Sequence, residues 1–263
     1  MPLHADAHGD PAASKVVLVH GFTQTRRSWA PLVPRLARHH RVLAVDAPAH
    51  GRSADHRTDL AEGANLLGET GGCAAYIGYS MGGRLALHLA LQRPELVERV
   101  VLVGATGGLD TEEERSQRRA ADEVLAIELE RDGLDAFLER WLANPLFATL
   151  PKDPAALEDR RENTVEGLAD SLRRTGTGTQ EPLWGHLPQL SMPALLVVGE
   201  RDEKFTVLAN RLADGWGGPA RVAVIADAGH ACHVEQPEAF LDLVMPFLDE
   251  GQRTASPAAN SNP

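Results

Sequence analysis

Cysteine is scarce in this sequence, with only Cys73 and Cys232 among 263 residues. Two thiols provide neither the disulfide framework of a small secreted domain nor the four-cysteine set of a structural zinc site. The 11 histidines are scattered and no HExxH motif occurs, so we expect no metal site. This cysteine usage suits a reducing compartment, and we therefore expect a cytoplasmic protein.

The sequence also lacks any apolar run close to the roughly 20 residues that a membrane-spanning helix needs. Its first 14 residues contain no basic stretch followed by an apolar one, so they do not resemble a secretory signal. Positive charge is in deficit, because 26 Lys and Arg face 37 Asp and Glu and leave a net charge of −11. An acidic chain repels phosphate groups, so we expect neither a nucleic-acid partner nor a membrane partner.

Short valine-rich runs stand out along the chain, whose length suits one large domain. They lie at 15–19, 41–45, 74–78, 99–103, 194–198 and 221–226. Continuous apolar runs of this length are typical of strands buried on both faces. Amphipathic stretches of helical length lie between them, at about 27–38, 59–70, 82–92, 205–214 and 237–249. The alternation predicts an α/β fold, with a mostly parallel sheet and helices on both faces.

The alternation is interrupted between residues 106 and 190, where no β-branched run occurs. Helical segments are expected there from Thr111, around 134–142 and around 154–174, and Thr111 with Glu114 forms a capping-box pattern. We predict a helical lid at 106–190, inserted into a core formed by 14–105 and 191–249. The polar, proline-containing stretch 250–263 is predicted to be a disordered tail.

The sharpest chemical signal is a G-x-S-x-G motif, GYSMG at 78–82, followed by Gly83. It follows an apolar strand and opens a helix, which is the context of a nucleophile elbow. The glycines allow the backbone to turn sharply at Ser80 without Cβ clashes. The motif therefore predicts Ser80 as a nucleophile or base at a helix N-terminus, where the Met81 amide can stabilise developing negative charge.

A serine hydroxyl needs a histidine to activate it, and the histidine needs a carboxylate to orient it. In this topology the acid and then the histidine follow the serine in chain order. Asp202 and His230 each come directly after a predicted strand, so we predict that they complete a triad with Ser80. Asp227 and Glu200 are the alternative candidates for the acid, and His233 is the alternative candidate for the histidine. Asp46 precedes the serine and is expected to have a structural role.

The HGF tripeptide at 20–22 follows the first predicted strand and would face the elbow. The Phe22 amide is expected to supply the second oxyanion donor, beside that of Met81. His20 is expected to be a buried histidine that holds this loop by hydrogen bonds. Cys232 is close to the predicted histidine in sequence, but we expect an unreactive loop thiol.

These motifs together resemble the α/β-hydrolase fold over residues 14–249. They are HGF at 20–22, AHGRS at 49–53, GYSMGG at 78–83, GERD at 199–202 and GH at 229–230. The lid is similar to that of one subfamily, 2-succinyl-6-hydroxy-2,4-cyclohexadiene-1-carboxylate synthase of menaquinone biosynthesis. This second resemblance rests on FLERWLANPLFATL at 137–150, Arg161, Asn163, GLADSLRRTGTGTQEPLW at 167–184 and GERDEKF at 199–205.

The resemblance implies a lyase without a cofactor, in which the triad abstracts a proton and pyruvate is eliminated. It also implies that Tyr79, Arg84, Arg118 and Trp141 line a pocket for a small carboxylate substrate. Spacing gives partial support, since Arg84 lies one helical turn after Ser80 and a guanidinium binds carboxylate in bidentate fashion.

Plainer roles stay open for three of these residues. Arg84 could pair with a structural acid, Arg118 could pair with Glu114, and Trp141 could belong to the lid core. A serine hydrolase acting on a small carboxylate-bearing ester or carbon–carbon bond is the alternative function, and a non-enzymatic binding protein is the third. The sequence gives no indication of the oligomeric state.

Overall fold

A seven-stranded sheet forms the centre of the computed structural model, which describes residues 1–250. Its strand order is β1-β3-β2-β4-β5-β6-β7, and only β1 runs antiparallel to its neighbour. The strands are β1 Ala5–His8, β2 Lys15–Val19, β3 Arg41–Val45, β4 Ala74–Tyr79, β5 Val97–Val103, β6 Ala194–Gly199 and β7 Ala220–Ile225. The six valine-rich runs are thus all strands, and their parallel pairing brings their carboxyl ends to one edge of the sheet.

Strand β1 was not among the expected strands. Its four residues, Ala-Asp-Ala-His, pair with β3 at the border of the sheet and contain no apolar run. An edge strand has only one neighbour and is half exposed, so its sequence carries little of the pattern of a buried strand. The predicted disordered tail, apart from Glu250, lies outside the described residues.

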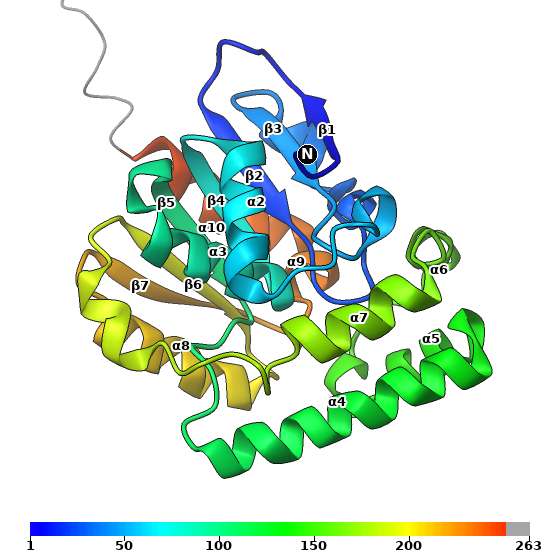
Figure 1. Ribbon diagram of the computed structural model, residues 1–263. Coiled ribbons are helices and arrows are strands. Elements are labelled where there is room, and N and C mark those ends of the chain that lie inside the picture. Colours follow the sequence, from blue (N-terminus) through cyan, green and yellow to red (C-terminus); the bar gives the residue numbers. More distant parts are fainter. Residues whose placement is uncertain (251–263) are drawn as a thin grey trace, which may run out of the picture.

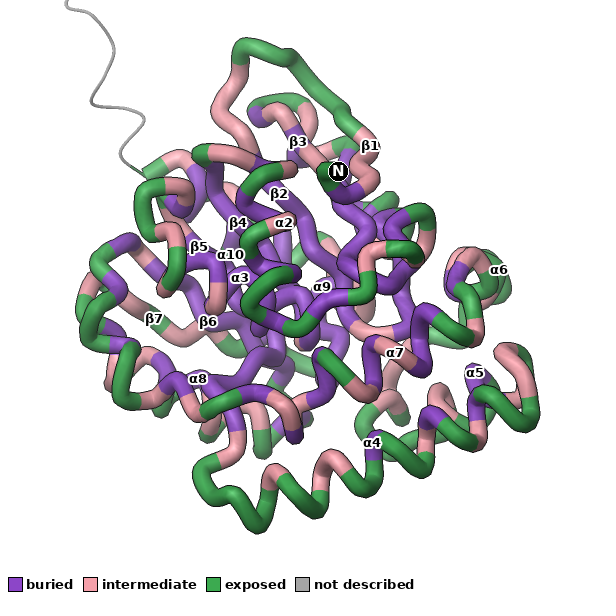
Figure 2. Tube along the Cα trace, in the orientation of Figure 1, coloured by how far each residue is buried: buried purple, intermediate pink, exposed green. Residues whose placement is uncertain are grey.

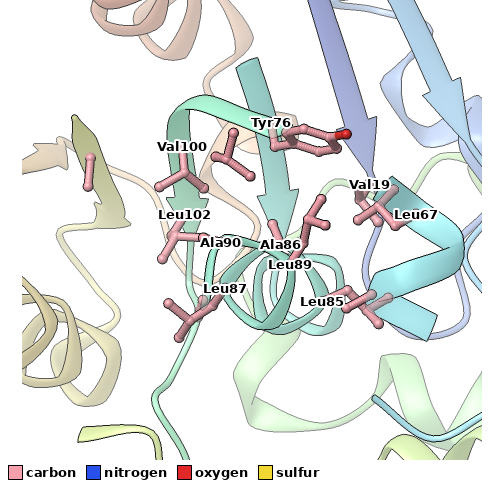
Figure 3. Close-up of a cluster of buried hydrophobic side chains, with 14 of the residues drawn as sticks. Val19, Leu67, Tyr76, Leu85, Ala86, Leu87, Leu89, Ala90, Val100 and Leu102 are labelled. Atoms are coloured by element: carbon pink, nitrogen blue, oxygen red, sulfur yellow. The ribbon is translucent and has the colours of Figure 1, made fainter. Parts of the chain in front are cut away.

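Helices cover both faces of the sheet (Figure 1). On one face α2 (Leu60–Gly71), α3 (Met81–Gln92) and α8 (Glu203–Gly215) share a buried apolar cluster with the strands. On the other face α1 (Val33–Leu36), α9 (Cys232–Glu235) and α10 (Pro237–Asp249) share a second one. Figure 2 shows the central strands as buried and the outer helices with one exposed side, and Figure 3 shows side chains of α3 packed against β4 and β5. No helix within residues 1–250 has the length and apolar character needed to cross a bilayer.

Helices also fill the segment between β5 and β6. They are α4 Glu112–Asp132, α5 Leu134–Leu142, α6 Pro154–Arg160 and α7 Val165–Thr175, with short 3₁₀ turns at Pro145–Phe147 (η4) and Trp184–Gln189 (η5). Helices α4, α5 and α7 pack around a small apolar core of their own. Figure 1 shows this group on the side of the molecule towards which the strands' carboxyl ends point. Thr111 and Glu114 form the predicted capping box at the start of α4.

Two expected helices are shorter than predicted. The stretch 27–38 contains only a 3₁₀ turn, η1 (Arg26–Trp29), and the four-residue helix α1, because Pro31 cannot donate a backbone hydrogen bond. The stretch 154–174 is split into α6 and α7, where Thr164 caps the second helix by accepting a hydrogen bond from the amide of Gly167. Two further 3₁₀ turns lie at Gly51–Ser53 (η2) and Pro94–Leu96 (η3).

Candidate active site

Ser80 lies in the sharp turn between β4 and α3, with φ 49° and ψ −106°. A positive φ is unfavourable for a residue with a Cβ, so the turn holds Ser80 in a strained conformation. The neighbouring glycines make room for the turn by having no Cβ. A Cβ on Gly78 would lie 2.4 Å from the carbonyl oxygen of Gly82, and one on Gly82 would lie 2.2 Å from that of Val19. These distances explain why the motif needs glycine on both sides of the serine.

A chain of hydrogen-bonding atoms connects Ser80, His230 and Asp202. Nε2 of His230 lies 3.3 Å from Ser80 Oγ, and Nδ1 of His230 lies 2.7 Å from Asp202 Oδ2. Both partners of the serine are buried, with 3% exposure for His230 and 7% for Asp202. Since the carboxylate accepts from Nδ1–H, the other ring nitrogen is left free to accept the proton of the serine hydroxyl.

The packing around the histidine fixes the orientation of its ring. Phe205 lies against it with the ring centroids 4.4 Å apart, and Tyr79 lies on another side at 5.3 Å. Gly104 completes the enclosure, because a Cβ there would lie 2.8 Å from Cε1 of His230. A second hydrogen bond holds the Asp202 side chain in place. Its other oxygen accepts from the amide of Phe205 and thereby caps the N-terminus of α8.

The alternative triad members lie elsewhere. Asp227 is exposed and pairs with Arg201 at 2.8 Å, and Glu200 accepts a hydrogen bond from the amide of Asp227. His233 is fully buried between Trp29 and Tyr79, and neither of its ring nitrogens has a hydrogen-bond partner among the described residues. Burial lowers the pKa of His233 to about 3, so this ring is neutral.

Phe22 lies in the loop after β2, and Met81 is the first residue of α3. Both line the cavity that Ser80 also lines. His20 holds this loop, because its Nε2 accepts from the amide of Ala47 at 3.0 Å and its Nδ1 donates to the carbonyl of Gly21 at 2.8 Å. Burial lowers the pKa of His20 to about 4 and so keeps the ring neutral, while the two hydrogen bonds determine its tautomer.

A cavity of about 170 Å³ opens above Ser80. A buried cavity of roughly 150 Å³ can hold a benzene molecule, so this one has room for a six-membered ring. Four cationic side chains and one carboxylate line it: Arg84, Arg118, Arg160, Lys204 and Asp122. The pocket is therefore positive although the chain as a whole carries a net charge of −11.

Arg84 is buried and lies one helical turn after Ser80 on α3. Its Nη1 donates to Gln180 Oε1 at 3.4 Å, and no carboxylate of residues 1–250 lies within ion-pair distance of it. Burial, together with the nearby charge of Arg118, lowers the pKa of Arg84 to about 10, although the charge of Asp122 acts in the opposite direction. The pairing with a structural acid that was open for this residue is not formed.

Arg118 pairs with Asp122, four residues later on α4, with Nε 2.9 Å from Oδ1. The expected alternative, a pair with Glu114, is wrong because the Glu114 carboxylate is used in the capping box with Thr111. Asp122 is 2% exposed, and burial raises its pKa. The pair uses Nε of the guanidinium, so its two terminal nitrogens take no part in this contact, and Arg118 also lines the cavity.

Tyr79 and Trp141 complete two walls of the cavity. Trp141 packs against Phe22 and Phe147, with ring centroids 5.1 Å and 5.8 Å apart, so it is both part of an aromatic cluster and part of the lining. Tyr79 is buried, and burial raises the pKa of its hydroxyl. The phenol is therefore neutral near neutral pH, and its ring packs against those of His230 and His233.

Sequence reasoning missed Arg160, which is 7% exposed and lines the cavity from the end of α6. Burial lowers the pKa of this arginine, and its Nη1 donates to the hydroxyl of Thr23. A signal existed in the sequence, since Arg160 and Arg161 are adjacent in the lid, but no pattern indicated which of the two faces inward. Arg161 instead pairs with Asp135 on the surface.

Within residues 1–250 no group of three or more His, Cys, Asp or Glu is arranged to hold a metal ion. Cys232 is fully buried and opens the short helix α9, but burial raises the pKa of its thiol to about 12. The thiolate is therefore not formed near neutral pH.

A model of the alpha/beta hydrolase family matches residues 16–243. The chain belongs to the alpha/beta hydrolase family. The fold class expected from the sequence is thereby confirmed, and the Ser80 turn occupies the place of the nucleophile elbow of an alpha/beta hydrolase.

Several alpha/beta hydrolases are similar to this chain over most of its length. The 2-succinyl-6-hydroxy-2,4-cyclohexadiene-1-carboxylate synthase of Escherichia coli O1:K1 / APEC is 34% identical over 248 residues, which are 90% of this chain and 95% of that one. A Bacillus subtilis (strain 168) protein, provisionally given the same name, is 36% identical over 256 residues, 91% of this chain and 92% of that one. The solved structure of MenH from S. aureus covers 95% of this chain and 99% of its own, with 26% identity and a TM-score of 0.83.

Proposed function

We propose that this alpha/beta hydrolase eliminates pyruvate from a cyclohexene-carboxylate precursor and forms 2-succinyl-6-hydroxy-2,4-cyclohexadiene-1-carboxylate in menaquinone biosynthesis. The single observation that carries the proposal is the cationic cavity directly above Ser80 in an otherwise acidic chain. The reaction's product carries two carboxylates, one on the ring and one on the succinyl group, so such a pocket fits it. The synthases that are 33–36% identical to the chain support the same function.

In the proposed mechanism Ser80, Asp202 and His230 form the catalytic triad. His230 accepts the serine proton at Nε2, and Asp202 stabilises the imidazolium through Nδ1. The serine oxygen then takes a proton from the ring carbon of the substrate. The electron pair of that C–H bond forms the new ring double bond, and the enolpyruvyl group leaves as pyruvate after protonation.

The amides of Phe22 and Met81 are proposed to stabilise the negative charge that develops during this step. Both residues line the cavity, and Met81 begins α3, where the helix N-terminus favours negative charge. Arg84, Arg118 and the newly found Arg160 are proposed to bind the carboxylates, while Tyr79 and Trp141 enclose the ring. No residue in this scheme requires a cofactor.

Pyruvate release tests this proposal. Purified protein is mixed with the cyclohexene-carboxylate precursor, and pyruvate is followed by its reduction to lactate with lactate dehydrogenase and NADH. We expect stoichiometric pyruvate from the wild type. Ser80→Ala, with an unchanged circular-dichroism spectrum, should be slower by about 10⁴-fold or more. Wild-type protein that released no pyruvate would remove the synthase proposal.

A serine hydrolase is the second candidate function. A triad of this geometry can also attack an ester. The solved structure of a thermophilic esterase from Thermogutta terrifontis with malate bound matches this chain over 94% of its length and 95% of the esterase, with 26% identity and a TM-score of 0.71. A burst of 4-nitrophenol from an activated acetate or butyrate ester would favour acyl-enzyme chemistry. Absence of pyruvate release together with such a burst would make this function the better one.

Three further proposals accompany the synthase function. Residues 106–190 are proposed to act as a lid over a core of 14–105 and 191–249, because their helices pack on a separate apolar core. A cytoplasmic location is proposed, and the two free thiols support it. The proposed partner is a small carboxylate rather than a nucleic acid, which the net charge of −11 supports.

A further inference from the structure

Asn163 is buried in the connection between α6 and α7, with only 4% of its surface exposed. Its side-chain nitrogen donates to the carbonyl of Thr23 at 2.8 Å and to that of Arg160 at 2.9 Å, and it lies 3.4 Å from the carbonyl of Gln24. Its side-chain oxygen accepts from the amide of Gly51 at 2.9 Å. One side chain of the proposed lid therefore joins two loops of the core to the end of α6.

The loop that Asn163 holds is strained. Thr23 is fully buried and has φ 66°, which is unfavourable for a β-branched residue. Such a conformation persists only where the surroundings hold it. Two side chains of the proposed lid form hydrogen bonds with Thr23. Asn163 donates to its carbonyl, and Arg160 donates to its hydroxyl.

The same loop carries the amide of Phe22, which directly precedes Thr23. Inside the loop, Gln24 accepts from the amide of Gly21 through its side chain at 3.0 Å and donates from its own amide to the Gly21 carbonyl at 3.1 Å. Gly21 and Gln24 are thus fixed to each other. The Thr23 carbonyl that Asn163 holds belongs to the Thr23–Gln24 peptide, and the Phe22 amide belongs to the Gly21–Phe22 peptide of the same closed turn. Because the two ends of the turn are joined by hydrogen bonds, a change in the Thr23 backbone would have to be absorbed within the turn and would move the Phe22 amide.

We propose that Asn163 is a positioning residue that holds the Phe22 amide in its working orientation, so that the lid helps to form the oxyanion hole. The inference rests on the proposed role of the Phe22 amide. Arg160 joins the two functions, since it lines the cavity and also donates to Thr23.

The experiment compares Asn163→Asp with the wild type. Aspartate has the same size and keeps an oxygen for the amide of Gly51, but it replaces the donor that faces the carbonyls of Thr23 and Arg160 with an acceptor. We expect kcat for pyruvate release to fall at least 30-fold. The Kd of 2-succinylbenzoate, an aromatic ring with the two carboxylates of the product, should change less than threefold.

A fluorophosphonate ester provides a second readout that does not depend on the lyase reaction. Ser80 Oγ attacks phosphorus while its proton passes to Nε2 of His230, and the P–F bond breaks as fluoride leaves. The charged phosphonyl oxygen of the transition state needs the oxyanion donors. Phosphonylation of Asn163→Asp, followed by mass spectrometry, should also slow at least 30-fold. If the wild type is phosphonylated but releases no pyruvate, the synthase proposal fails while this comparison still decides the role of Asn163.

Arg27→Ala is the matched control. Arg27 also links the lid to the core, since its Nη1 lies 2.5 Å from Glu162 and 3.3 Å from Asp159, but it does so at the surface, away from the Thr23 carbonyl. We expect kcat and the phosphonylation rate of Arg27→Ala to stay within twofold of the wild type.

Three results would overturn the proposal. They are folded Asn163→Asp with both rates within threefold of the wild type, an equal loss in Arg27→Ala, or a weaker Kd with unchanged kcat. If Asn163→Asp does not fold, the same measurements on Asn163→Ala, which removes the donor to the Thr23 carbonyl without adding a charge, decide the question by the same criteria.

Discussion

Strained residues gather at one edge of the sheet. Within residues 1–250 four residues other than glycine have positive φ: Thr23, Ala49, Ser80 and Asp227. Each lies in the loop that follows the carboxyl end of a strand, after β2, β3, β4 and β7 respectively. Two of them, Ser80 and Thr23, are direct chain neighbours of the proposed oxyanion donors Met81 and Phe22. The strain therefore lies where backbone atoms must be aimed at a ligand rather than where they pair in the sheet.

The two aspartates near His230 should respond very differently to replacement. Asp202→Asn keeps the size and the cap of α8 but cannot hold Nδ1–H, so kcat for pyruvate release should fall roughly 10⁴-fold. Asp227→Asn changes an exposed residue that pairs with Arg201, and we expect kcat within threefold of the wild type. Steady-state kinetics on both variants check this, and the reverse order of effects would mean that the acid of the triad is misassigned.

Replacement of Arg84 should affect charged substrates selectively. Its guanidinium is buried beside the cavity and has only the side chain of Gln180 as a partner among the described residues, so it is available to a carboxylate. Arg84→Ala should lower kcat/KM for the precursor. The corresponding loss of transition-state stabilisation should be about 1.5–3 kcal/mol, the range for hydrogen bonds to charged groups.

The control for Arg84→Ala is a pair of 4-nitrophenyl esters, butyrate and hydrogen succinate, of which only the second carries a carboxylate. If kcat/KM falls equally for both esters in the variant, the arginine supports the structure of the site and does not bind the carboxylate.

Helix α3 begins with residues that have a low helix propensity. Two of its first three residues, Gly82 and Gly83, are glycine, although glycine weakens a helix by about 1 kcal/mol relative to alanine. The reason is the close approach of α3 to β2, since the main chain of Val19 and His20 occupies the space of a Cβ on Gly82. Tertiary contact therefore outweighs helix propensity here.

Gly82→Ala tests this explanation. On propensity alone the substitution would stabilise the helix, but the added Cβ would lie 2.2 Å from the carbonyl oxygen of Val19. We expect the free energy of unfolding to fall by at least about 2 kcal/mol, as in overpacked cores. Gly185→Ala is the control, because no atom lies within 4 Å of its added Cβ, and it should stay within about 0.5 kcal/mol of the wild type in urea denaturation. Equal stability of both variants would contradict the explanation.

At the scale of the whole molecule, the fold encloses several neutral histidines. Burial lowers the pKa of His20 to about 4 and that of His50 and His233 to about 3, from an ordinary value of 6.5. In the unfolded chain these rings take up protons near pH 6.5, whereas in the folded protein they do not until the pH is much lower. Their contribution to stability is therefore complete above pH 6.5 and is lost as the pH falls towards 3–4.

The pH dependence of unfolding provides a test of this view. The free energy of unfolding of the wild type should decrease steadily from pH 6.5 to pH 4. His233→Phe keeps a ring between Trp29 and Tyr79 without a titrating group, and it should make the slope shallower by about 1.4 kcal/mol per pH unit, the value for one proton. Urea titrations at pH 4.5, 5.5 and 6.5 measure the slope, and an unchanged slope in the variant would show that His233 is not a source of the acid sensitivity.

The sequence by itself determined the sheet and the elbow. Continuous apolar runs can only be buried between two layers of helices, and glycines around a serine after such a run permit a turn that most residues forbid. The order of serine, aspartate and histidine at successive strand ends then followed from the direction of parallel strands. Strand β1 was not predicted, because an edge strand needs no apolar run.

Only the tertiary structure decided which side chains meet across distant segments. It chose Arg160 over Arg161 for the cavity, Asp122 over Glu114 as the partner of Arg118, and Asn163 as the link to Thr23. The physical reason is that each choice depends on how the helices between β5 and β6 rotate and dock on the core. Local pattern gives the apolar face of a helix but not which polar group at its border faces a cavity formed by another part of the chain.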